Sequence, residues 1–202
     1  MALASILLNI LDLADQFTLL DDVKTKLLNN PDKAAEGLSE VLKDLHTMYE
    51  SLDTEIVNLL SLDIAKPEAD AANRKVLYTL TGGQLQIKLG VARASCHKID
   101  QIYWNHLSGW FSRILATSEQ ERLRELFSHL GTADDGFINT INSVENWLNQ
   151  SANELLGCLD RKDYASAETY LLDLRMNSSA GRKSITDTMR KLQELELAFN
   201  PK

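Results

Sequence analysis

The sequence predicts an all-α protein, an elongated up-and-down antiparallel helical bundle that forms one domain over residues 1–202. Apolar residues recur every three or four positions along most of the chain, which is the spacing that lines one side of a helix. Only 3 prolines and 9 glycines occur in 202 residues, too few turn-forming residues for an all-β chain. The pattern predicts four long helices, an N-terminal helix and a short helix near residues 119–130.

The N-terminal helix is expected over residues 3–29, where apolar side chains step by three and four. Its first half is apolar on almost every side, so we expect it to be buried in the core. Peripheral contact with a membrane surface is the less favoured interpretation of this helix.

The clearest helix runs from about Asp32 to Leu62. Its apolar side chains repeat with the heptad spacing of a coiled coil, at Leu38, Leu42, Leu45, Tyr49, Leu52, Ile56 and Leu59. A helix with this seam is not stable alone in water, so it needs long partner helices. After a short linker, Pro67 is expected to open the next helix.

Residues 75–91 fit two structures. Between residues 85 and 91 apolar and polar side chains alternate, and the run follows Gly82 and Gly83, as in a small β-hairpin with a Gly-Gly turn. A two-stranded ribbon is only marginally stable by itself, and residues 89–116 show clear helical spacing. A continuous or kinked helix is therefore the favoured prediction, and the hairpin stays open as the alternative.

The last part of the chain contains three more helices. Ser118 and Glu121 have the spacing of a capping box, which predicts the start of the short helix. Residues 132–135 then cap a helix that ends near Asp160. After a tight turn at residues 161–163, the apolar register continues without interruption, which predicts a final helix of about 35 residues.

The net charge of −8 arises entirely in the first third of the chain. Residues 1–63 carry 12 acidic and 4 basic side chains, whereas the remainder carries 17 of each. This acidic balance disfavours nucleic-acid binding and could steer a basic partner. No apolar run reaches the roughly 20 residues that span a bilayer, and no basic residue precedes the apolar N-terminus as in a secretory signal. The sequence therefore predicts a cytoplasmic protein with no membrane span.

No motif predicts an enzyme, a metal site or a cofactor. Phosphate-binding loops, dinucleotide fingerprints, nucleophile elbows and zinc signatures are all absent from the sequence. Cys96 and Cys158 are expected to be small core residues. A site assembled from distant histidines and acids is the one enzymatic possibility left open.

The densest unusual feature is the aromatic segment 103–111. Tyr103 and Trp110 share the expected core seam, whereas Trp104 and Phe111, seven residues apart, are expected to form a second stripe beside it. Either the short helix at 119–130 folds back over the second stripe, or the stripe is an exposed anchor for a partner.

These features predict a non-enzymatic protein-interaction, scaffold or regulatory bundle. Its expected contact residues are Tyr103, Trp104, Trp110 and Phe111, and its partner is another protein or a second copy of the chain. The alternative is a small-ligand-binding or sensory bundle with a pocket between helices near His97 and His106.

Overall fold

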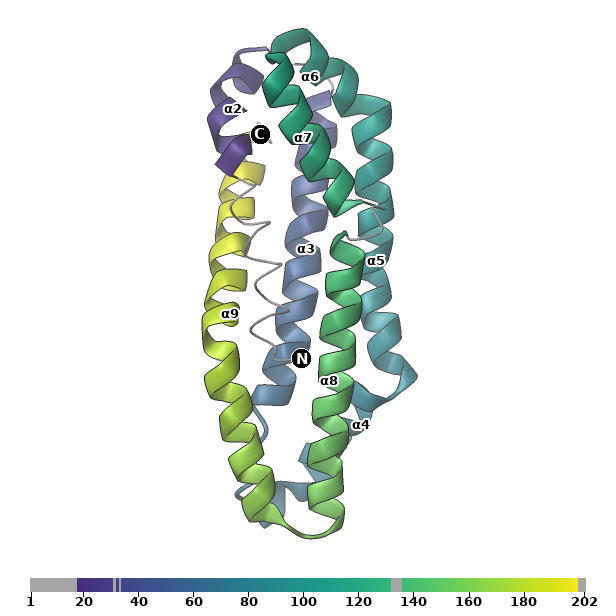
Figure 1. Ribbon diagram of the computed structural model, residues 1–202, viewed down its shortest axis with the longest axis vertical. Helices are drawn as coiled ribbons and strands as arrows, with labels where there is room; N and C mark the ends of the chain where they lie inside the picture. The colour runs from purple at the N-terminus through teal and green to yellow at the C-terminus, as the bar shows by residue number, and fades with distance from the viewer. Residues whose placement is uncertain (1–17, 31, 33, 132–135, 200–202) are drawn as a thin grey trace.

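The computed structural model describes residues 18–30, 32, 34–131 and 136–199, and these residues form an elongated helical bundle (Figure 1). Four long helices run along its length: α3 (Ala34–Leu60), α5 (Gly83–Ile102), α8 (Phe137–Asp160) and α9 (Tyr164–Phe199). The shorter helices α2 (Thr18–Asn29), α6 (Ser108–Ile114) and α7 (Thr117–Leu130) gather at one end, and α4 (Asp70–Thr81), preceded by a 3₁₀ turn (Pro67–Ala69), lies at the other. The predicted all-α bundle is confirmed.

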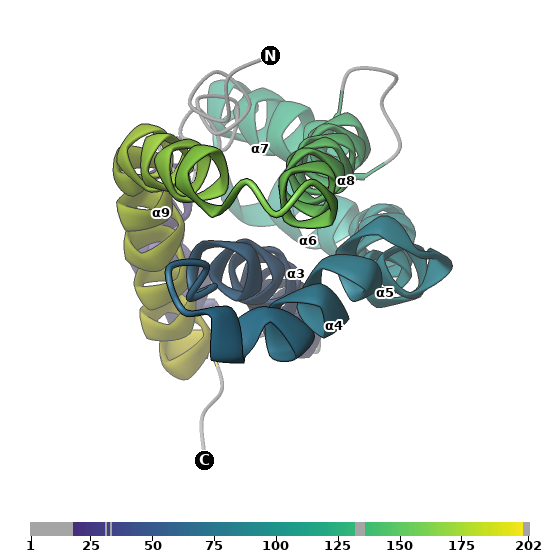
Figure 2. The same cartoon turned by 90° about the horizontal axis from the view of Figure 1, so that it is seen from below.

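Helix α3 packs against α9 and α5, and both run antiparallel to it. Seen from the end of the bundle, α9 lies on one side of α3 and α4 and α5 lie on the other (Figure 2). Arg175 of α9 donates from Nε to the Leu60 carbonyl at 2.8 Å. Arg182, seven residues further along α9, donates from Nε to Oδ1 of Asp53, which lies seven residues before Leu60 on α3. Residue numbers thus rise on α9 as they fall on α3, which is the predicted up-and-down arrangement.

The predicted seam of α3 forms the centre of the core. All seven of its members are buried: Leu38, Leu42, Leu45, Tyr49, Leu52, Ile56 and Leu59. Because burial of a large apolar side chain contributes about 1.5–3 kcal/mol, this helix is held mainly by packing against its neighbours. Tyr49 packs against Phe137 of α8, with ring centroids 5.4 Å apart.

The β-hairpin alternative for residues 75–91 is wrong. Helix α4 ends at Thr81, Gly82 is extended, and α5 begins at Gly83, so the segment is a helix broken at one glycine. Leu85 and Leu89 are buried, whereas Ile87 and Val91 are exposed. These two pairs alternate in sequence as they would in a strand, but each pair is also four residues apart and so shares one face of a helix.

The predicted capping box at Ser118 is also wrong by two positions. Helix α7 begins at Thr117 after an extended Ala116, and the Ala116 N–H donates to Oε2 of Glu119 at 2.9 Å. Ser118 therefore lies inside the first turn, and Glu119 supplies the capping carboxylate. Glu119 also pairs with Lys26 of α2 at 2.5 Å, and this contact, with the Ala116 hydrogen bond, lowers its pKa.

The predicted long final helix is confirmed, since α9 is 36 residues long without a break. The turn before it is closed by Lys162, whose φ is +58°, and by the Asp163 N–H, which donates to the Cys158 carbonyl at 2.9 Å. Asp163 then caps α9 by accepting the Ser166 N–H at 3.2 Å. The expected helix is present over residues 18–29, whereas residues 3–17 and the expected cap at 132–135 lie outside the described residues.

Candidate functional site

A π-helical turn joins α5 to α6 and changes which side chains face the core. It spans Tyr103–Leu107, and the Ser108 N–H donates to the Tyr103 carbonyl five residues back. A π-turn contains one residue more than an α-helical turn, so every side chain after it is rotated relative to the earlier register. After the π-turn, Leu107, Trp110 and Phe111 are all buried, so the core-facing side of α6 includes both aromatic residues.

Because of this rotation, Trp104 and Phe111 do not share a stripe. Phe111 is 1% exposed and Trp104 is 57% exposed. The expected common face is therefore wrong, because seven residues complete two turns only where the helix is α-helical throughout. The expected cover by the short helix applies to Phe111, which lies 6.1 Å from the Phe127 ring of α7.

The other two aromatic residues of the segment belong to the core. Tyr103 stacks on Phe127 with ring centroids 4.9 Å apart, and burial raises the pKa of its hydroxyl. Trp110 is 2% exposed and donates from Nε1 to the Asn30 carbonyl at 3.1 Å, which ties α6 to the end of α2. Of the four aromatic residues predicted to make contacts, only Trp104 lies at the surface.

Trp104 lies at one end of a surface that we name the α5 outer face. Its members lie on one side of α5 and continue into the π-turn: Ile87, Gly90, Val91, Ala94, His97, Gln101 and Trp104. Ile87 is 75% exposed and Val91 is 57% exposed. At 1.5 Å per residue the face is about 25 Å long. Lys98 also lies on this side, four residues after Ala94, but its ammonium group is drawn to Glu40 of α3. The face otherwise contains no acid, lysine or arginine, which is little charge for the outside of a surface helix.

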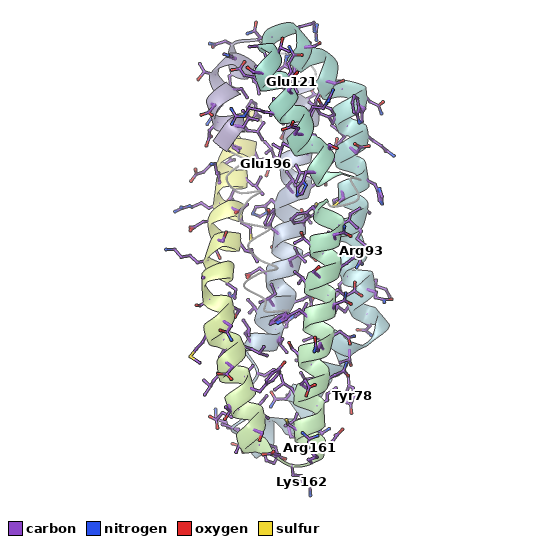
Figure 3. All side chains as sticks on the ribbon, in the orientation of Figure 1. Tyr78, Arg93, Glu121, Arg161, Lys162 and Glu196 are labelled. Atoms are coloured by element: carbon purple, nitrogen blue, oxygen red, sulfur yellow. The ribbon has the colours of Figure 1, made fainter. Side chains whose placement is uncertain are left out.

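The cations of α5 are held against neighbouring helices at the edges of this face. Lys98 pairs with Glu40 of α3 at 2.6 Å, and the hydrogen bond to Glu40 raises the pKa of Lys98. On the other edge Arg93 binds Glu145 and Asn142 of α8, and Figure 3 shows Arg93 next to that helix. These pairs clamp α5 between α3 and α8 and draw the charged groups of Lys98 and Arg93 toward those two helices.

Neither His97 nor His106, near which an inter-helix pocket is expected, lines the corner of α3, α4 and α5 or the two smaller hollows at α3–α9 and α2–α7. Both histidines are exposed, His97 on the α5 outer face and His106 on the π-turn. The neighbouring Cys96 is buried instead, and burial raises the pKa of its thiol to about 12. A thiol with this pKa is not a nucleophile at neutral pH. In the described ranges no three histidine, cysteine or carboxylate side chains come together as a metal site.

A hollow does occur elsewhere, where α3, α4 and α5 meet, and we name it the corner hollow. Its volume is about 390 Å³ and its lining consists of Glu55, Asn58, Ala72, Lys75, Val76, Thr79, Leu80 and Lys88. The sequence pattern did not indicate Glu55, because this residue lies on the polar side of α3. In the structure it is nevertheless only 4% exposed. Its ion-pair partner Lys88 is 33 positions away, so no local signal indicates the pairing.

No known family, no curated protein and no solved structure matches this chain. Of the helices within the described residues, none combines the length and the apolar character needed to cross a membrane. Function must therefore be inferred from the two surfaces themselves, the α5 outer face and the corner hollow.

Proposed function

We propose that this protein is a non-enzymatic protein-interaction module that binds an amphipathic helix of a partner protein through the α5 outer face. The observation that carries the proposal is the exposure of Ile87, Val91 and Trp104 on the outer side of one helix, where the one cation, Lys98, is paired with Glu40 of α3. Single exposed apolar residues are ordinary, but a 25 Å row with so little charge is typical of a contact surface (about 17 residues at 1.5 Å each). Tryptophan is also the residue most enriched at the energetic centre of interfaces.

The shape of the face suits a helix laid along it. Large side chains stand at the two ends, Ile87 and Val91 at one and Trp104 at the other, and small Gly90 and Ala94 lie between them. A Cβ added at Gly90 would meet no atom within 4 Å, so the centre is open. Small residues at a helix contact let two backbones approach closely, while larger residues beside them interlock with the partner.

The charge of the surroundings favours a partner helix with basic flanks. The edge of α3 beside α5 carries the exposed acids Glu36 and Glu40, and the contact of Glu40 with Lys98 shows that this edge borders the face. Residues 1–63 hold 12 acidic against 4 basic side chains. Complementary charge accelerates encounter and selects the partner's orientation, whereas the apolar contacts hold the complex together.

The test is a fluorescence titration of the full chain with a tryptophan-free amphipathic peptide of leucine and lysine, about 18 residues long so that it matches the face. Docking removes the Trp104 ring from water, so we expect its emission to shift to shorter wavelength. Trp110 and Trp147 are buried and supply a constant background. Val91→Glu is expected to abolish the shift, whereas the matched control Met176→Glu, on the exposed side of α9, is expected to leave it unchanged.

Two outcomes would contradict the proposal. A scrambled peptide of the same composition that binds equally well would show charge attraction without a docking surface. An unchanged Trp104 emission with the amphipathic peptide would show that the face does not accept a helix. Light scattering adds one further distinction. If the wild type is a dimer and Val91→Glu is a monomer, the α5 outer face is a contact surface whose partner is a second copy of the chain.

A further inference from the structure

The corner hollow is built around a buried carboxylate and is separate from the α5 outer face. Oε1 of Glu55 accepts a hydrogen bond from Lys88 Nζ at 2.7 Å, and Oε2 accepts one from Asn58 Nδ2 at 3.2 Å. A buried carboxylate is costly unless its oxygens are paired, so these contacts fix Glu55 in place. Glu55 in turn holds the ammonium group of Lys88 at the wall of the hollow.

The hollow carries more positive than negative charge. An ammonium group has three N–H donors, and Glu55 uses one donor of Lys88. Lys75 of α4 also lines the hollow and forms no ion pair with any residue that the structure describes. Two ammonium groups therefore accompany one carboxylate, and this excess suits a ligand with a single negative charge.

The remaining wall is apolar. Ala72, Val76 and Leu80 follow one another at intervals of four along α4, so they form one stripe beside the two lysines. The volume of about 390 Å³ is near the lower end of the roughly 300–1,000 Å³ of small-molecule sites. The lining thus combines a cationic end with an aliphatic side, and its size suits a small molecule.

We infer that the corner hollow binds a small carboxylate ligand with an aliphatic body. The carboxylate lies between Lys75 and Lys88, and the aliphatic body packs against Val76 and Leu80. A cationic ligand would have to displace Lys88 from Glu55, and a neutral one would leave both lysines unused. Glu55 acts as a positioning residue, because it orients Lys88 without contacting the ligand.

The probe is octanoate, titrated into the full chain while the backbone amide signals of Asn58 and Thr79 are followed by NMR. We expect saturable shifts of both signals, and weaker shifts with octanol and octylamine. Lys75→Gln is expected to weaken octanoate binding about tenfold or more, because it removes a charge-assisted hydrogen bond. Lys183→Gln, the same change at an exposed lysine of α9, is expected to leave the affinity unchanged.

A second variant tests the position of the site without changing any charge. Ala72→Phe fills the hollow and is expected to abolish octanoate binding, with circular dichroism used to verify that the variant is folded. Octanoate binding that survives Ala72→Phe, equal binding of octanol, tighter binding of octylamine, or no saturable shift would each overturn the inference. None of these results affects the proposal for the α5 outer face, which is tested by Trp104 and Val91.

Discussion

The outer faces of α5 and α9 are sides of the same bundle, yet they are built differently. On α9 the exposed Leu172 and Met176 are neighbours four residues apart, but several charged side chains lie between Met176 and Leu197. On α5, Val91 and Trp104 are separated along the face by alanine, histidine, glutamine and one cation, Lys98, whose ammonium group is paired with Glu40 of α3. The comparison shows that exposed apolar residues are not informative singly; the scarcity of free charge between them distinguishes a contact surface.

The cations of the two helices differ only in part. On α9, Arg182 pairs with Asp53 of α3 and Lys191 with Asp21 of α2, as Lys88 and Lys98 of α5 pair with acids of α3. Arg190 differs, because it approaches Asp187 of its own helix at 3.5 Å and both side chains are largely exposed. Ion pairs therefore hold both helices to their neighbours, and α9 has in addition charge that stays on its outer face.

The largest expected effect separates the inner from the outer side of each helix. Leu89→Ala on α5 and Leu192→Ala on α9 each remove a fully buried side chain, so we expect each to lower the free energy of unfolding by about 2–5 kcal/mol. Ile87→Ala and Met176→Ala should change it by no more than about 0.5 kcal/mol. Urea denaturation measures all four. A cost for Ile87→Ala as large as that for Leu89→Ala would mean that the α5 outer face is covered in the free protein.

A smaller effect is expected from exchanging glycine and alanine on the two outer faces. Gly90→Ala on α5 should stabilise the fold by about 0.5–1 kcal/mol, because the space around Gly90 is open and alanine favours helix. Ala180→Gly, at an exposed position of α9, should destabilise it by a similar amount. If the partner helix approaches closely at Gly90, Gly90→Ala should weaken binding of the amphipathic peptide although it stabilises the fold. Unchanged peptide binding would show that a small residue at position 90 is not needed for docking.

The smallest effect concerns the pH dependence of the edge of α5. Glu40 raises the pKa of Lys98, so the ion pair stabilises the fold below the ordinary lysine pKa of about 10.4 and is lost as pH rises through the raised pKa. Both partners are about half exposed, so the effect is roughly 0.2–1 kcal/mol. Urea midpoints up to about pH 11 should fall less steeply in Lys98→Gln than in the wild type. Arg190→Gln on α9 is the control, since arginine does not titrate in this range.

Much of the fold could be predicted because helical periodicity is local. The seam from Leu38 to Leu59 and the unbroken register of α9 are both visible in the apolar spacing, and both are present in the structure. The segment around Leu85 and Leu89 was ambiguous for a physical reason: residues four apart share a face in a helix and a side in a strand. Only packing against the rest of the bundle decides between these structures.

The candidate sites could be predicted in part. The sequence indicates Trp104 and Phe111 together as a second aromatic stripe, either covered or exposed, but the separation of exposed Trp104 from buried Phe111 depends on the π-turn at Tyr103–Leu107. In the same way, the acidic character of α3 is plain in the sequence, whereas the burial of Glu55 is not.

The sequence by itself therefore determined the number and inner faces of the long helices, because these depend on the repeat of apolar residues along one segment; the end of α5 at Ile102, inside the helical pattern of residues 89–116, it did not. The tertiary structure alone decided the π-turn, the exposure of Trp104 and the burial of Glu55. Tyr103 and Phe111 are held inward by Phe127 of α7, and Glu55 is held by Lys88 of α5. These contacts join segments far apart in the chain, and their energies enter only when the helices pack against one another.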